Sequence, residues 1–135
     1  MASGLYPSGA EDMMDGTIIL SSSDITPALV NTSYTYSSAH DFWDDVTANE
    51  VQDGGATFLS GKSVTSGVFD ATDYTFASVS GSDIDNINLR KYNAADASSP
   101  LLAYIECTQT TPNGNNIDII WDAGSNKIFA FSLAS

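Results

Sequence analysis

The sequence predicts a mainly β fold, an antiparallel β-sandwich or open barrel, on two observations. Apolar and polar residues alternate with the period of two that half-buried strands show, most clearly in residues 117–122 and 85–92. The segments between such runs are rich in Gly, Ser, Asn and Asp, as in TPNG at 111–114, which is turn chemistry. A chain of 135 residues has the size of one domain that buries a core without disulfides.

Taken in order, nine segments have the pattern of strands. Pro27 cannot donate a main-chain hydrogen bond, so the strand that contains it is expected at a sheet edge or at a bulge. Only turn sequences separate the last three segments, which predicts a C-terminal three-stranded antiparallel meander. The predicted strands are 16–20, 25–30, 57–59, 62–65, 73–79, 85–92, 101–108, 117–122 and 127–133.

One short helix is predicted at 39–47, with Ser38 as its N-cap, because Phe42, Trp43 and Val46 share one face at helical spacing. A weaker helical turn is predicted at 9–14. No linker divides the chain and no internal repeat is present. We therefore predict an N-terminal arm, 1–15, followed by a single β domain, 16–135.

The balance of charge restricts the partners. The chain carries 17 acidic and four basic residues, a formal net charge of −13. Such a charge repels phosphates over a Debye length of about 8 Å at physiological salt, so neither nucleic acid nor an anionic membrane is an expected partner. No run of about 18 apolar residues occurs, and the start lacks a basic region followed by an apolar run, so we expect no membrane span and no signal peptide.

The chain is poor in catalytic side chains, with one His and one Cys. His40 beside Asp41 and a serine could form a triad, but serines are so frequent that helix-start hydrogen bonding is the favoured role. The many acids offer pairs for glycoside hydrolysis, yet none lies in a recognisable motif. Asp41, Asp44 and Asp45 are expected on a solvated helix face. We predict no catalytic residue and no cofactor.

One segment resembles a known metal-binding motif, the calcium-binding loop of the EF-hand. Asp83, Asp85, Asn86 and Asn88 resemble its opening, because hard cations prefer clustered oxygen ligands. The sixth position, however, is Asn88 instead of Gly, and the twelfth is Ala94 instead of a bidentate Glu. We predict no metal.

Three residues have both a functional and a structural interpretation. Cys107 lies on a predicted strand with no charge pattern to activate it, and is expected in the core. Trp43 and Trp121 could stack on a sugar, as exposed aromatic residues do in carbohydrate-binding modules. Their periodicity instead favours burial on a helix face and on a strand face.

The order of the short motifs resembles that of a family of small virion structural proteins of tailed bacteriophages, over nearly the whole chain. The start departs from the family, whose members tend to carry a longer basic and apolar helix, whereas residues 7–12 here are a poor helix former. The motifs are LY at 5–6, GTIIL at 16–20, ALV at 28–30, YTYSSAHDF at 34–42, LSGKSVT at 59–65, GVFDATDYTF at 67–76, SPLLAYI at 99–105, TPNG at 111–114 and WDAGSNKIF at 121–129.

The resemblance implies a protein that attaches to the phage particle, and the acidic charge favours the outside of the head, away from packaged DNA. We expect a capsid decoration, or cement, protein that binds the major capsid protein, is assembled in the host cytoplasm and forms a homodimer or homotrimer. A tail or head-to-tail connector component and a host-surface-binding module are the alternatives.

The candidate partner-binding residues fall into three groups. The first is apolar and lies in the predicted arm, where a free chain leaves it partly wet: Leu5, Tyr6, Met13 and Met14. The second comprises three of the scarce cations, Lys62, Arg90 and Lys91. Because neighbours on a strand point to opposite faces, one of Arg90 and Lys91 is expected to be structural. The third is the polar loop 49–56, and the acids are expected to face solvent.

Overall fold

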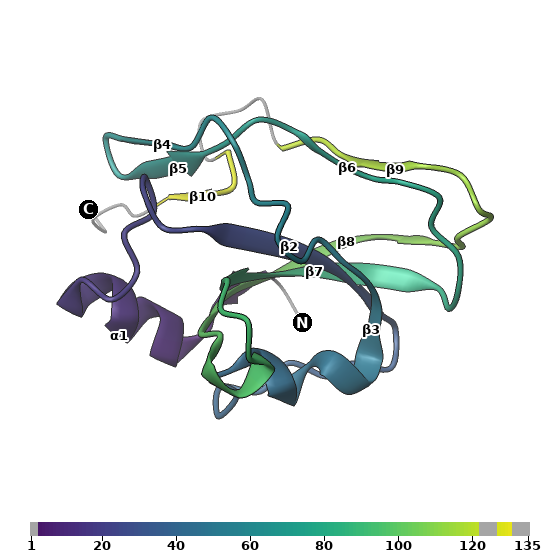
Figure 1. The fold of residues 1–135 in the computed structure, drawn as a ribbon, viewed down its shortest axis with the longest axis horizontal. Coiled ribbons are helices and arrows are strands. Elements are labelled where there is room, and N and C mark those ends of the chain that lie inside the picture. Colours follow the sequence, from purple (N-terminus) through teal and green to yellow (C-terminus); the bar gives the residue numbers. More distant parts are fainter. Residues whose placement is uncertain (1–2, 122–126, 131–135) are drawn as a thin grey trace.

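The computed structural model describes residues 3–121 and 127–130 (Figure 1). Strand makes up 38% and helix 15%, with one α-helix and antiparallel sheets, so the mainly β prediction is confirmed. The strands are β1 Gly4–Leu5, β2 Ile25–Asn31, β3 Glu50–Asp53, β4 Ser63–Thr65, β5 Val68–Asp70, β6 Tyr74–Phe76, β7 Ile84–Lys91, β8 Leu101–Thr110, β9 Ile117–Ile119 and β10 Phe129–Ala130. The α-helix is α1 Pro7–Asp15, and short 3₁₀ turns occupy Trp43–Asp45, Thr47–Asn49 and Asp96–Ser98.

A five-stranded antiparallel sheet in the order β1-β8-β7-β2-β3 lies at the centre of the molecule. Strands β2 and β7 are covered on both faces, so that successive side chains, which point to opposite sides of a strand, are nearly all buried. On β2, Ile25 and Leu29 belong to one core cluster, whereas Ala28 and Val30 belong to the other. This is why β2 has an almost continuous run of buried residues instead of an alternating one.

Two smaller sheets, β10-β5-β4 and β6-β9, cover one face of the large sheet (Figure 1). The main core lies between these layers, where Leu29 and Leu89 of the large sheet join the same cluster as Phe69, Phe76 and Trp121. The arrangement agrees with a β-sandwich or open barrel.

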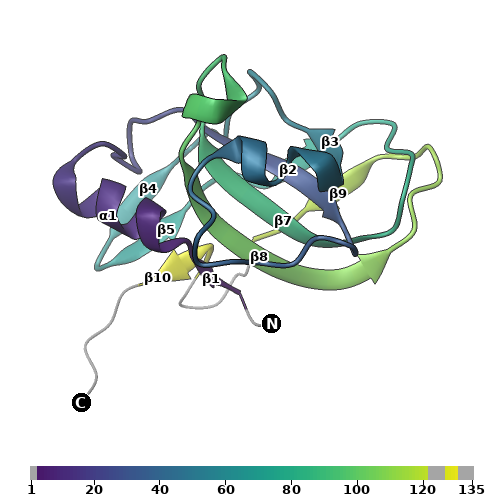
Figure 2. The same ribbon diagram turned by 90° about the horizontal axis from the view of Figure 1, so that it is seen from below.

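The 3₁₀ turns and the segment between β2 and β3 cover the other face (Figure 2). They contribute Tyr34, Trp43 and Val46 to a second core cluster, in which Tyr6 and Tyr104 also take part. Buried polar side chains lie on this face of β7, so the second core combines aromatic rings with hydrogen-bonding groups.

The described N-terminal residues differ from the predicted free arm. Strand β1 pairs with β8, and the main-chain N–H of Tyr6 donates to Leu102 O at 3.1 Å. The Tyr6 side chain is fully buried, and residues 7–15 form α1 although 7–12 was expected to be a poor helix former. Packing of α1 against β8 stabilises it beyond its intrinsic propensity.

The predicted C-terminal meander was wrong, although all three segments do contain strands. Strand β8 pairs with β7 and β1, β9 pairs with β6, and β10 pairs with β5. The turn sequences therefore connect different sheets. Residues 122–126 and 131–133, which belong to the predicted segments 117–122 and 127–133, lie outside the described residues.

The expectation that Pro27 marks a sheet edge was wrong, because β2 lies between β7 and β3, and the register irregularities of β2 come after Pro27, at Leu29/Val30 and Val30/Asn31. Pro27 O accepts from the N–H of Gly54 at 3.0 Å, on the side of β3. In an antiparallel strand the main-chain N and O of one residue point to the same side. The nitrogen of Pro27 therefore faces the point where β3 has ended, and no ladder hydrogen bond is lost.

Other boundaries differ for local reasons. The helix predicted at 39–47 is replaced by two 3₁₀ turns, because the N–H of Trp43 donates to Ser99 O at 2.9 Å instead of closing a helical turn. Residues 16–20 and 57–59 are not strands. Strands β1, β3 and β5 were not predicted, and β3 takes up part of the loop 49–56 that was expected to be adhesive.

Candidate docking surface

Arg90 is in the interior and cannot serve as a docking cation. It is 1% exposed, and its guanidinium donates to both carboxylate oxygens of Asp53 at 2.7 and 2.8 Å. The Arg90 Cζ atom lies 4.4 Å from the centre of the Trp43 ring, a cation–π geometry. The expectation that one of Arg90 and Lys91 is structural is confirmed, and the candidate role of Arg90 in partner binding is wrong.

The two lysines of the candidate set are bonded to the main chain. Lys62 Nζ donates to Leu59 O at 3.2 Å, and Lys91 Nζ donates to Thr17 O at 2.7 Å. Both side chains are half-buried. Most of the scarce positive charge thus stabilises loops and the core.

The acids have the opposite distribution, as expected. None of the Asp and Glu side chains in the described residues is buried, and Arg90 is the one buried charged residue among them. The surface of the protein is therefore rich in carboxylates, whereas the Arg90 guanidinium is buried in the interior. A surface of this kind favours basic partners.

Large apolar side chains are exposed at one end of the molecule. Met14 of α1 is 83% exposed, Ile19 in the following loop 53%, and Val64 of β4 50%. Met13, Ile19 and Val64 line a hollow of about 340 Å³, together with Gly16, Ile18, Leu20 and Ser21. We call this feature, which is lined by α1, the loop 16–21 and β4, the apolar hollow. Of the four apolar residues predicted in the arm, Met13 lines the hollow and Met14 is the next residue in the chain.

Local hydrogen bonds hold the loop that presents Ile19. Helix α1 ends at Asp15, and the following Gly16 adopts a left-handed conformation at φ 87°. The Asp15 carboxylate then accepts from Thr17 N at 3.0 Å and from Thr17 Oγ1 at 2.7 Å, and these bonds hold the pKa of Asp15 below its usual value. Ser23 Oγ accepts from Ile19 N at 2.9 Å, so the loop is fixed on both sides of the hollow.

The helix beside the hollow is acidic. Glu11, Asp12 and Asp15 all lie on α1. The pKa of Asp12 is raised, first by partial desolvation and then by repulsion from Asp15 and Glu11, and the nearby Lys91 offsets these effects only in part. Like charges therefore remain unneutralised next to exposed apolar side chains.

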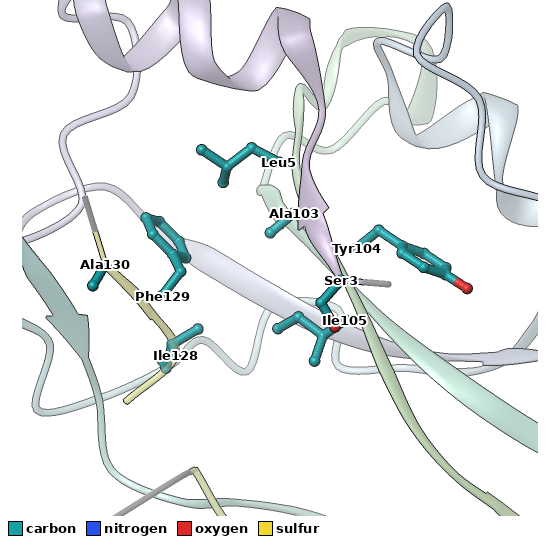
Figure 3. A pocket seen from close by; sticks show the side chains of 9 residues that line it. Ser3, Leu5, Ala103, Tyr104, Ile105, Ile128, Phe129 and Ala130 are labelled. Carbon is teal, nitrogen blue, oxygen red and sulfur yellow. The ribbon is translucent and has the colours of Figure 1, made fainter. Parts of the chain in front are cut away.

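Leu5 and Tyr6, the other arm residues, lie elsewhere. Leu5 lines a cavity of about 240 Å³ between β1 and β8 on one side and β10 on the other. In Figure 3, Leu5, Ala103 and Ile105 face Ile128 and Phe129 across this cavity. Leu5 thus packs between the layers, and Tyr6, which is buried, is not available to a partner.

A chain of hydrogen bonds crosses the second core from His40. Its Nδ1 lies 2.7 Å from the Tyr34 hydroxyl, which lies 2.7 Å from the Tyr6 hydroxyl, which in turn donates to Asn88 Oδ1. Asn88 Nδ2 then donates to Asn86 Oδ1 at 2.9 Å. His40 therefore contacts a tyrosine where a triad would need a serine, and sequence periodicity gave no sign of this network because its members are distant in the chain.

The remaining candidates divide between core and surface. Trp43 and Trp121 are 1% and 8% exposed, so their assignment to the core is confirmed. Cys107 is exposed, and its assignment to the core was wrong, because β8 is covered only over its first half. Asn86 and Asn88 are buried and bonded within the chain, so they do not join Asp83 and Asp85 in one cation site.

Comparison with known proteins did not identify a relative of this chain. A scan against protein-family models, a search of curated proteins and a search of solved structures each found no match. Among the described helices, none is long and apolar enough to cross a membrane.

Proposed function

We propose that the protein is a structural component of a tailed-bacteriophage virion that decorates the outer surface of the head by binding the major capsid protein. The observation that supports this most is the separation of charge: none of the described Asp and Glu side chains is buried, whereas Arg90 is buried and Lys62 and Lys91 bond to main-chain oxygens. An anionic exterior disfavours packaged DNA as a neighbour and favours a basic protein surface.

The fold supports a role in binding. The exposed apolar hollow offers a protein contact, since apolar surface rimmed by polar residues is typical of interaction sites. Capsid surfaces repeat the same contact many times around symmetry axes. A homodimer or homotrimer of this chain would engage several contacts at once and gain avidity from them.

Purified heads that lack the protein provide the test. We expect the added protein to saturate them at on the order of hundreds of copies per head, because decoration follows the repeated capsid lattice. A ring of about six or twelve copies would identify a connector, and a handful of copies at fibre tips a host-binding module. Either count, obtained by quantitative mass spectrometry of virions, would contradict decoration.

The salt dependence of binding gives an independent check. Contacts between surface carboxylates and a basic partner weaken as ionic strength rises from about 0.05 to 0.5 M, because the Debye length shortens. We expect the dissociation constant on heads to increase over this range. Binding that does not respond to salt would show that exposed carboxylates make no contribution.

A further inference from the structure

The apolar hollow is the place in the described chain where two largely exposed apolar side chains, Ile19 and Val64, meet from different elements. Of the described residues, Ile120, 75% exposed, is the one such side chain in a second hollow of about 410 Å³, which charged residues of both signs, Asp118 and Lys127, also line. Single exposed apolar residues are ordinary, but an exposed apolar cluster next to polar residues is typical of a contact site.

We propose that the apolar hollow is the docking face of the protein, and that its partner is a protein segment with apolar side chains flanked by Lys or Arg. The apolar side chains would enter the hollow between Met13, Ile19 and Val64. The flanking cations would lie against the carboxylates of α1. This inference rests on the proposed function only for the identity of that partner as the major capsid protein.

Charge complementarity selects this partner. Helix α1 carries Glu11, Asp12 and Asp15 and no basic residue, and the net charge of the whole chain is −13. An acidic segment, or the same face of a second copy, would bring like charges together at the hollow. A cation beside Asp12 would relieve the repulsion from Glu11 and Asp15, which lie on the same helix.

The hollow is also held ready for a partner. The bonds from Asp15 to Thr17 and from Ser23 to Ile19 fix the loop, and Lys91 holds Thr17 O to the end of β7. A loop that is already ordered loses little conformational entropy on binding. Met13 adds an unbranched side chain that adapts to irregular apolar surfaces.

Three substitutions of equal kind test the docking face. Ile19→Ser and Val64→Ser remove apolar surface from the hollow, and Ile120→Ser removes it at an exposed position elsewhere. All three sites are exposed, so melting of each variant is expected to match the parent protein. Two binding probes are used: purified heads that lack the protein, and a synthetic 12-residue peptide of alternating leucine and lysine pairs.

On heads, each hollow variant is expected to weaken binding about fivefold or more, and Ile120→Ser to change it less than about twofold, because a partner would bury the exposed half of the Ile19 or Val64 side chain. With the peptide, amide resonances of Ile19 and Val64 are expected to shift in NMR spectra, while that of Ile120 stays in place. Equal binding of all three variants to heads, or peptide shifts confined to other residues, would overturn the docking face.

The two probes separate this inference from the proposed function. If the parent protein does not bind heads but the peptide shifts the resonances of Ile19 and Val64, the docking face stands and the capsid is the wrong partner. If the parent binds heads and both hollow variants bind equally well, decoration stands and the docking face is wrong.

Discussion

At the scale of single residues, Arg90 determines how this acidic chain uses its few cations. The guanidinium is buried between Asp53 and Trp43, and its Nε is buried without a hydrogen-bond partner among the described residues. A buried ion pair of this kind adds little to the stability of the fold compared with an apolar pair of the same volume. Removing one partner, however, leaves an unpaired buried charge, which destabilises the fold. The pair therefore links β3 to β7 across the intervening strand β2.

We expect Asp53→Asn to destabilise the protein by about 3–5 kcal/mol, because Arg90 would remain charged and buried without its carboxylate. Urea unfolding followed by circular dichroism measures the change. Asp24→Asn is the control, since Asp24 is exposed and the substitution changes the net charge equally. If both variants unfold at the same urea concentration, Arg90 does not depend on Asp53.

The hydrogen-bond network of the second core determines where the proton of His40 lies. Asn86 Nδ2 faces the carbonyl oxygens of Val30 and Asn31, so the amide orientations of Asn86 and Asn88 are set in turn. The Tyr6 hydroxyl proton then goes to Asn88. The Tyr34 proton must go to Tyr6, and the 2.7 Å contact between Tyr34 and His40 needs a proton on Nδ1.

We therefore predict that neutral His40 carries its proton on Nδ1 and leaves Nε2 without one. Two-bond ¹H–¹⁵N correlation spectra distinguish the two ring nitrogens directly. Tyr34→Phe removes the hydroxyl oxygen that accepts from His40 Nδ1, so in this variant we expect the proton to be found on either ring nitrogen. Finding the proton on Nε2 in the parent protein would mean that one contact in the chain is not a hydrogen bond.

The same tyrosines predict how stability depends on alkaline pH. Burial raises the pKa of Tyr6, and burial with the nearby Glu106 raises the pKa of Tyr104 to about 12. Unfolded tyrosines ionise near about pH 10, so above that pH the unfolded chain releases protons that the native protein keeps. Stability from these groups is complete below about pH 10 and is lost as pH rises towards the native pKa values.

We expect the free energy of unfolding to fall between about pH 9 and 11, and to fall less in Tyr6→Phe, which has no hydroxyl to ionise there. Tyr92→Phe is the control, because the Tyr92 hydroxyl makes no hydrogen bond to the described residues. A parent protein whose stability is constant over this range would contradict the buried, protonated state of Tyr6.

At the scale of elements, α1 can pack closely against β8 because Gly9 has no side chain. A Cβ atom built there would lie 2.5 Å from Leu101 O and 2.9 Å from Leu102 O, both main-chain atoms of β8. Gly is unfavourable inside an isolated helix by about 1 kcal/mol, so its presence here is explained by close packing. The position of α1, and with it Met13 and the hollow, depends on this contact.

We predict that Gly9→Ala lowers stability by about 1–3 kcal/mol despite the better helix propensity of Ala, because the main chain of β8 must shift. Gly4→Ala is the matched control, since a Cβ atom there would meet nothing within 4 Å. Thermal unfolding of the two variants gives the comparison. A more stable Gly9→Ala would show that α1 does not lie against β8.

Elements with a strong local signal were the ones that the sequence predicted well. The alternating segment 85–92 and the segment 101–108, which a turn sequence follows, correspond to β7 and β8, which pair with each other over most of their length. Short elements failed where a distant contact decides the conformation. The N–H of Trp43 bonds to Ser99, which replaces a helix by a 3₁₀ turn, and β1 forms only because β8 offers an edge to Gly4 and Leu5.

At the scale of the whole molecule, the charge pattern was predictable but the allocation of cations was not. Composition alone indicates that so many acids must lie at the surface, and none of the described ones is fully buried. It does not show that Arg90 faces inward on β7 while Lys91 reaches the loop after α1. The apolar hollow combines Met13, Ile19 and Val64 from three elements, so only Met13 and its neighbour Met14 were candidates from sequence.

The proposed role requires that the whole domain sits on the outside of a phage head with the apolar hollow towards the capsid. A reconstruction of the virion at a resolution that traces this chain measures both statements at once. We predict density for the domain on the outer head surface, with Ile19 and Val64 against apolar side chains of the major capsid protein and basic residues beside α1. Density in the tail, or on the head with the hollow facing solvent, would contradict the account.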